Sequence, residues 1–301
     1  MPPRPLDLLD LPTLYRYRSE AVSLDSVRFL TRGNPLGAAG FMSYFNPAKH
    51  LYTAINQENG TTLLGGVIQT NGDTFAKLVY LAPEANLTHA SLPALIEHLS
   101  AEAGKWGAFH VLAEIEEGSD AFPALRRAGF SVYAWQRIWD ISDIAAGEGS
   151  CGWAPIQDVT LPAVQSLYHQ IVPPLLQPVE QAPKQAVGLV CDESSRCYVH
   201  ISYGVHGIVF TPLIHPEATG VAAMLASLLN QLPDGRGRPV YMCVRSYQAW
   251  LEPALEDLGG KAATRQAVMV KHLVRMVKEE QTVRAAQPAG VSVQPSRVTH
   301  P

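Results

Sequence analysis

Apolar and polar residues alternate with a strand-like period through the first half of the chain. Three such runs follow one another closely at 50–57, 61–70 and 73–83, with Asn-Gly pairs between them at 59–60 and 71–72. Asn-Gly between β-branched or alternating runs is the strongest short-range hairpin signal, because both turn residues must accept positive φ. The pattern therefore predicts a meander of three antiparallel strands.

After Pro83 the apolar period changes to that of an amphipathic helix, which the spacing predicts from residue 92 to Gly104 or Gly107. The same reading predicts an opening helix at 6–21, a strand at 109–116, a short helix at 119–129 and a long strand at 130–141. The first half is thus expected to run helix, three strands, helix, strand, helix, strand.

The second half repeats this order with weaker turn signals. Its predicted helices lie at 156–171, 221–232 and 247–260, and its predicted strands at 184–193, 196–203, 206–214, 239–246 and 264–274. Three anchor residues also recur at one offset of 130 residues, with Leu125, Gly129 and Gln136 matching Leu255, Gly259 and Gln266. Solenoid units run about 20–50 residues, so a repeat this long indicates a duplicated domain.

The repeat and the local composition divide the chain into two predicted domains and a tail. The domains span 1–146 and 152–278, joined by a small-residue linker. The tail at 279–301 has no periodicity and is expected to be disordered.

Charge and composition exclude several classes of function. A net charge of −4 without a basic run gives nothing to recruit a nucleic-acid backbone. No apolar run approaches the ~20 residues that span a bilayer, and the N-terminus does not resemble a signal peptide, so a soluble cytoplasmic protein is expected. The four cysteines and the scattered histidines lack metal-ligand spacing, so we expect buried thiols and no metal site.

The order of elements, together with the segment LRRAGFSVYAWQ at 125–136, resembles the GNAT (GCN5-related N-acetyltransferase) superfamily in tandem. The resemblance implies an α/β fold of two GNAT-like domains, each a mixed, mainly antiparallel sheet flanked by helices. It also implies that acetyl-CoA or another acyl-CoA binds where the fourth and fifth strands splay. The acceptor would be a small-molecule or protein amine, and a homodimer is a further expectation.

In the family, a glycine-rich loop after the fourth strand binds the pyrophosphate of coenzyme A through backbone N–H groups. Counted from Pro83, its signature positions fall on Asn86, His89 and Ser91, so the glycines are missing. By resemblance these residues, with Leu81 and Thr88, would contact the cofactor. The alternative is helix capping, with Asn86 or Thr88 as the N-cap.

The family's usual proton donor is also missing, because leucine stands at its position in both copies, at Leu125 and Leu255. Tyr80 and Glu84 are the residues expected to transfer protons if the first copy is active. Glu114 and Glu116, two apart on the following strand, would accept from a cationic substrate or form a solvated face. Two hypotheses follow: a GNAT-type N-acyltransferase, or a catalytically degenerate GNAT-fold module for binding or dimerisation.

Overall fold

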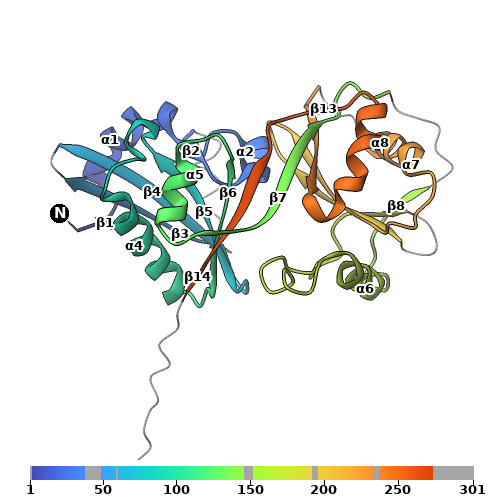
Figure 1. Ribbon diagram of the computed structural model, residues 1–301, viewed down its shortest axis with the longest axis horizontal. Coiled ribbons are helices and arrows are strands. Elements are labelled where there is room, and N and C mark those ends of the chain that lie inside the picture. Colours follow the sequence, from blue (N-terminus) through green and yellow to red (C-terminus); the bar gives the residue numbers. More distant parts are fainter. Residues whose placement is uncertain are drawn as a thin grey trace, which may run out of the picture.

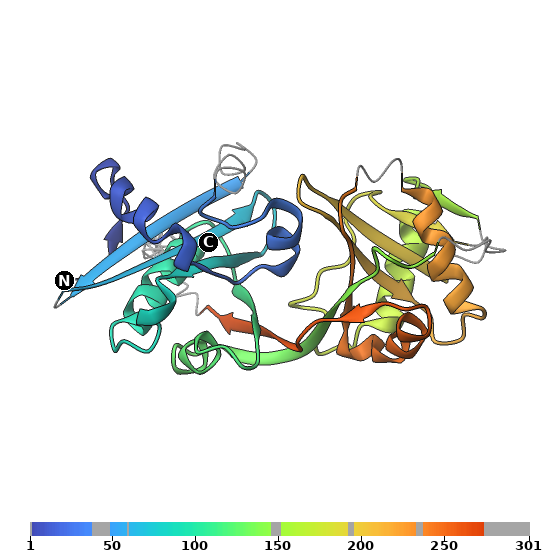
Figure 2. The same cartoon turned by 90° about the horizontal axis from the view of Figure 1, so that it is seen from above.

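The computed structural model describes residues 2–37, 49–58, 60–145, 152–191, 196–232 and 237–273. The predicted tail at 279–301 and Asn59 of the first turn lie outside these residues. The two halves lie end to end along the long axis of the molecule (Figures 1 and 2). No helix among the described residues is long and apolar enough to cross a membrane.

The strands of both halves join in one sheet of mixed but mainly antiparallel pairing. Its main path runs β1-β3-β4-β5-β6-β14-β7-β12-β11-β10-β9-β8. These strands are β1 (Arg4–Pro5), β3 (Lys49–Glu58), β4 (Thr61–Thr70), β5 (Phe75–Ala82), β6 (His110–Glu116), β7 (Ser131–Asp140), β8 (Trp153–Pro155), β9 (Leu189–Cys191), β10 (Cys197–Tyr203), β11 (Ile208–Ile214), β12 (Val240–Arg245) and β14 (Gln266–His272). Off the path, β2 (Val22–Ser23) pairs with β5, and β13 (Lys261–Ala262) pairs with β7.

The helices cover this sheet. The α-helices are α1 (Leu11–Arg16), α2 (Ser26–Arg32), α4 (Leu92–Lys105), α5 (Ala121–Arg127), α6 (Leu161–Ile171), α7 (Val221–Leu228) and α8 (Glu252–Asp257). Short 3-10 helices are η1 (Leu8–Asp10), η2 (Arg18–Glu20), η4 (Glu84–Asn86), η5 (Leu229–Gln231) and η6 (Ser246–Leu251). The prediction of a single helix at 6–21 is wrong, since η1, α1 and η2 divide that segment, and α2 was not predicted.

The predicted meander is confirmed as β3, β4 and β5. Gly60 and Gly72 follow β3 and β4 with φ of 80° and 86°, a conformation that L side chains disfavour. A β-bulge interrupts β4–β5, where Gly66 faces Tyr80 and the next pair is Val67 with Leu78. A Cβ on Gly66 would lie 2.5 Å from the Tyr80 ring, so glycine lets that ring pack against the sheet.

The two halves exchange their last strands, which the sequence did not predict. Strand β14 lies between β6 and β7 of the first half, and β7 pairs with β12 of the second half. Figure 1 shows β7 and β14 side by side at the junction. Gln136 faces Gln266, its equivalent in the repeat, and donates from Nε2 to Oε1 at 2.7 Å. The repeat offset therefore brings equivalent positions together at an approximate two-fold axis. The predicted domain boundaries, at 1–146 and 152–278, remain a prediction.

Helix α2 fastens the first half to the second. Its Val27 and Leu30 pack against Val209 of β11. At its end the Thr31 carbonyl accepts from the His206 backbone N–H at 3.0 Å. Apolar burial thus joins the halves beyond the shared sheet.

Candidate functional site

The gap between the fourth and fifth strands of the first copy is filled by the chain itself. Strands β5 and β6 pair in parallel only from Phe75 to Lys77, and beyond this they splay. Strand β2 enters there and pairs with β5 at Tyr80 and Leu81. The Leu24 N–H donates to the Val79 carbonyl at 2.9 Å, and the Leu24 carbonyl accepts from the Glu114 N–H at 2.9 Å.

These bonds use backbone groups on both sides of the gap, and Leu24 is 1% exposed. An acyl-CoA entering the first gap would therefore have to displace β2 and expose its paired backbone groups. The resemblance placed the cosubstrate at this position, and the position is occupied by residues 22–25.

A buried glutamine fills the corresponding gap of the second copy. Strands β11 and β12 pair in parallel from Ile208 to Phe210 and then splay. Gln248 of η6, 1% exposed, accepts from the Ile214 N–H at 2.9 Å and donates to the Pro212 carbonyl at 2.7 Å. Its carboxamide therefore binds the backbone groups that an amide-bearing ligand would need there.

In the loop expected to bind pyrophosphate, at 86–91, backbone N–H groups donate hydrogen bonds to acceptors within the same segment of the chain. The Leu87, His89 and Leu92 N–H groups donate to the carbonyls of Glu84, Asn86 and His89 at 3.0–3.1 Å. The Ser91 N–H donates to His89 Nδ1 at 3.2 Å. A phosphate at this loop would have to compete with these bonds.

The alternative prediction, that Asn86 or Thr88 caps the following helix, is wrong. Ser91 is the N-cap of α4, and it makes no side-chain capping bond. Asn86 instead donates from Nδ2 to the Thr62 carbonyl at 3.0 Å, which ties the loop to β4. Thr88 is exposed.

The structure does not bring the two expected proton-transfer residues together. Tyr80 is 1% exposed and packs in a hydrophobic cluster with Ile55 and Leu64, while Glu84 is exposed on η4. Leu81 is fully buried in the core of the first half. Catalysis by Tyr80 and Glu84, and cofactor binding by the loop and Leu81, therefore remain predictions.

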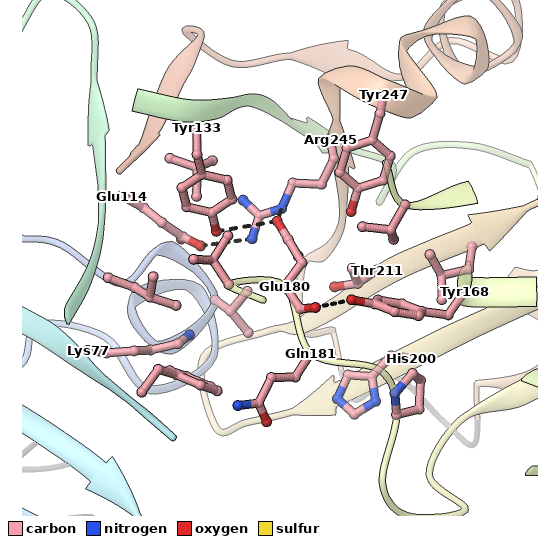
Figure 3. A pocket seen from close by; sticks show the side chains of 18 of the residues that line it. Lys77, Glu114, Tyr133, Tyr168, Glu180, Gln181, His200, Thr211, Arg245 and Tyr247 are labelled. Carbon is pink, nitrogen blue, oxygen red and sulfur yellow. Dashed lines mark hydrogen bonds and ion pairs between the residues drawn. The ribbon is translucent and has the colours of Figure 1, made fainter. Parts of the chain in front are cut away.

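A cavity of about 380 Å³ lies where the two halves meet (Figure 3). Ligand sites of about 300–1,000 Å³ are common at such junctions. Its apolar and aromatic lining includes Leu24, Val27, Phe75, Leu112, Tyr133, Tyr168, Val172, Val179, Tyr198, Leu213, Tyr247 and Val268. Its polar lining includes Lys77, Glu114, Glu180, Gln181, His200, Ser202, Thr211 and Arg245.

Arg245 at the end of β12 organises the charges of this cavity. Its Nε lies 3.0 Å from Glu180 Oε1 and its Nη2 lies 3.4 Å from Glu114 Oε1, while Nη1 donates to Gln136 Oε1. Lys77 forms a second ion pair with Asp25, at 3.2 Å. The solvated-face alternative is wrong for Glu114, because this residue is 7% exposed and paired with Arg245. Its expected contact with a cationic substrate remains a prediction.

Burial and these pairs shift the pKa values of the groups. Burial would raise the pKa of Glu114, but the charges of Arg245 and Lys77 hold it below its ordinary value. Burial lowers the pKa of His200, so its imidazole is neutral near pH 7. Burial and the Glu180 charge raise the pKa of Tyr133 well above its ordinary value, which keeps that phenol protonated.

The described histidine, cysteine and acidic residues bear on metal binding and on thiol chemistry. Within the described ranges, no group of three or more histidine, cysteine, aspartate or glutamate residues could hold a metal ion. Cys191 is disulfide-bonded, which corrects the expectation of a simple buried thiol. Cys243 matches that expectation, and burial raises its pKa to about 12.

Comparison with solved structures identifies the fold. A GCN5-related N-acetyltransferase from Sphaerobacter thermophilus matches with a TM-score of 0.54 and 13% identity, over 90% of this chain and 95% of its own. A tandem GNAT protein from the clavulanic acid biosynthesis pathway matches with a TM-score of 0.51 and 14% identity, over 90% and 98%. The chain therefore has the GNAT fold, and a tandem GNAT protein is similar to it over 90% of its length. No protein-family model and no curated protein sequence matches it.

Sequence reasoning singled out Glu114 but did not bring it together with the other residues of the inter-half cavity. Arg245 ends β12 of the second copy and Tyr247 follows it in η6, whereas Lys77 and Glu114 belong to the first copy. No spacing rule connects positions so distant. The one available signal was a charged residue, such as Glu114, within an apolar strand.

Proposed function

We propose that this chain is a catalytically degenerate GNAT-fold protein that binds a small molecule in the cavity between its halves. The observation that carries the proposal is that its own residues fill the strand gap of both copies. Strand β2 bonds to both edges of the first gap, and Gln248 bonds across the second. The missing loop glycines and proton donors agree with this proposal.

Acyl-CoA-dependent transfer to a small-molecule or protein amine is the second candidate. The GNAT fold of the chain favours it. For this activity β2 or Gln248 would have to leave its gap. Moving Gln248 alone would leave the Ile214 N–H and the Pro212 carbonyl buried without this hydrogen-bond partner, at a cost of about 1–3 kcal/mol each.

Calorimetric titration with acetyl-CoA tests the proposal. We expect no binding by the wild-type protein at roughly millimolar ligand, since both gaps are filled. Gln248→Ala frees the Ile214 N–H and the Pro212 carbonyl, and Gln231→Ala, at an exposed position, is its control. Weak binding by Gln248→Ala alone would support closure by this side chain.

An acylation assay with a panel of amines completes the test. Wild-type protein that binds acetyl-CoA and acetylates any amine would overturn the proposal in favour of the second candidate.

A further inference from the structure

Among the described residues, two cationic and two anionic side chains line the inter-half cavity, so its charged lining is balanced: Lys77, Arg245, Glu114 and Glu180. Arg245 pairs with Glu114 and Glu180, and Lys77 pairs with Asp25. A charged ligand would lose its hydration in this cavity without meeting an uncommitted counter-charge. The arrangement therefore disfavours both anions and cations.

The hydrogen-bonding groups left over are uncharged and belong to the second half. Among the described residues, the hydroxyl groups of Tyr247 and Thr211 have no hydrogen-bond partner, although both side chains line the cavity. His200 lies on the same side, and its Nδ1 is 3.4 Å from the Tyr198 hydroxyl. In Figure 3 these side chains face Lys77 and Glu114 across the cavity.

The rest of the lining suits an apolar body. Phe75 and Leu112 come from the first half, and Val179 and Leu213 come from the second. Burial of an apolar ligand surface against such side chains is favourable at about 25 cal/mol per Å². The cavity thus has an apolar interior and one uncharged hydrogen-bonding side.

We infer, resting on the proposed function, that the cavity takes an uncharged, mainly apolar small molecule with one hydrogen-bonding end, such as an alcohol or a phenol. Tyr247 and Thr211 bind that end and act as specificity residues. Charge selects against the ammonium and carboxylate analogues of the same molecule.

Three probes of matched shape test this inference: benzyl alcohol, benzoate and benzylammonium. Dissociation constants are measured by ligand-observed NMR titration with the full chain near pH 7. Benzyl alcohol should bind with roughly millimolar affinity, and the two ions should bind at least about tenfold more weakly. Absence of binding by benzyl alcohol, or equal or tighter binding by either ion, would overturn the inference.

Variants place the binding in the cavity. Tyr247→Phe keeps the ring and removes the hydroxyl, so it should weaken benzyl alcohol binding about fivefold. Tyr203→Phe, at a position 49% exposed, should leave the affinity unchanged, and thermal melts verify folding of both. Unchanged affinity in Tyr247→Phe would refute the role of its hydroxyl.

The two proposals fail separately. Acetyl-CoA turnover by the wild-type protein would overturn the proposed function whatever the order of the three probes. If the wild-type protein does not bind acetyl-CoA but the three probes bind in another order of affinity, only the inferred ligand class is overturned.

Discussion

Replacing Arg245 with methionine should destabilise the protein by about 3–5 kcal/mol, the usual cost of removing one partner from a buried ion pair. The Arg245 side chain is 14% exposed and lies between two carboxylates, 3.0 Å from Glu180 and 3.4 Å from Glu114. Methionine fills similar space but supplies no charge, so both carboxylates remain buried without this partner. The loss is large against a total stability of about 5–15 kcal/mol.

The loss should depend on pH in a definite direction. In the wild type the pKa of Glu114 is below its ordinary value, so its contribution is complete above the unfolded pKa and is lost as pH falls through the folded one. Without Arg245, burial dominates and raises this pKa. The variant's penalty is then greatest near pH 7 and shrinks as Glu114 becomes protonated on acidification. The difference in unfolding free energy between wild type and variant should therefore become smaller toward about pH 4.

Urea unfolding at several pH values, followed by tryptophan fluorescence, measures this difference. Arg137→Met is the matched control, because Arg137 pairs with Glu252 at 2.5 Å but is 37% exposed. A pair of that kind contributes about 0–1 kcal/mol. The reasoning is refuted if Arg245→Met lowers the free energy of unfolding no more than Arg137→Met does. It is also refuted if the destabilisation by Arg245→Met increases as the pH falls.

Two further substitutions test how the halves are joined, and both are measured by denaturation midpoints. In Gly204→Ala the added Cβ would lie 1.9 Å from the Thr31 carbonyl oxygen, so it should cost about 1–3 kcal/mol by forcing α2 away. Gly118→Ala meets nothing within 4 Å and should be near neutral, and equal midpoints for the two would contradict the contact. Gln136→Leu removes the bond to Gln266 and an acceptor for Arg245, so about 2–3 kcal/mol should be lost. Gln231→Leu is its exposed control, and a Gln136→Leu protein as stable as wild type would contradict the role of this pair.

Much of the fold was readable from local patterns. The Asn-Gly turns and alternating runs predicted β3 to β5, and the helical period after Pro83 predicted α4. Both signals act over a few residues, so they survive without tertiary information. The prediction of one opening helix at 6–21 failed because the apolar spacing there does not correspond to a buried face. Leu8 and Leu9 are 78% and 88% exposed.

The candidate site was much less accessible to sequence reasoning. Counting from Pro83 located the loop at 86–91 but could not show that its N–H groups bond within the loop. Nor does a local pattern mark Gln248, which becomes important only because β11 and β12 splay beside it. Contacts of this kind depend on neighbours far away in the sequence.

The sequence by itself determined the meander β3 to β5, helix α4, the repeat of the anchor residues and the absence of the expected catalytic groups, since these follow from local spacing and residue identity. Tertiary structure decided which strands are neighbours, and so placed Gln136 opposite Gln266 and Glu114 beside Arg245. The physical reason is that backbone edges and buried charges are satisfied by whatever lies next to them in space. Strand exchange and the filling of both gaps are therefore properties of the assembled sheet.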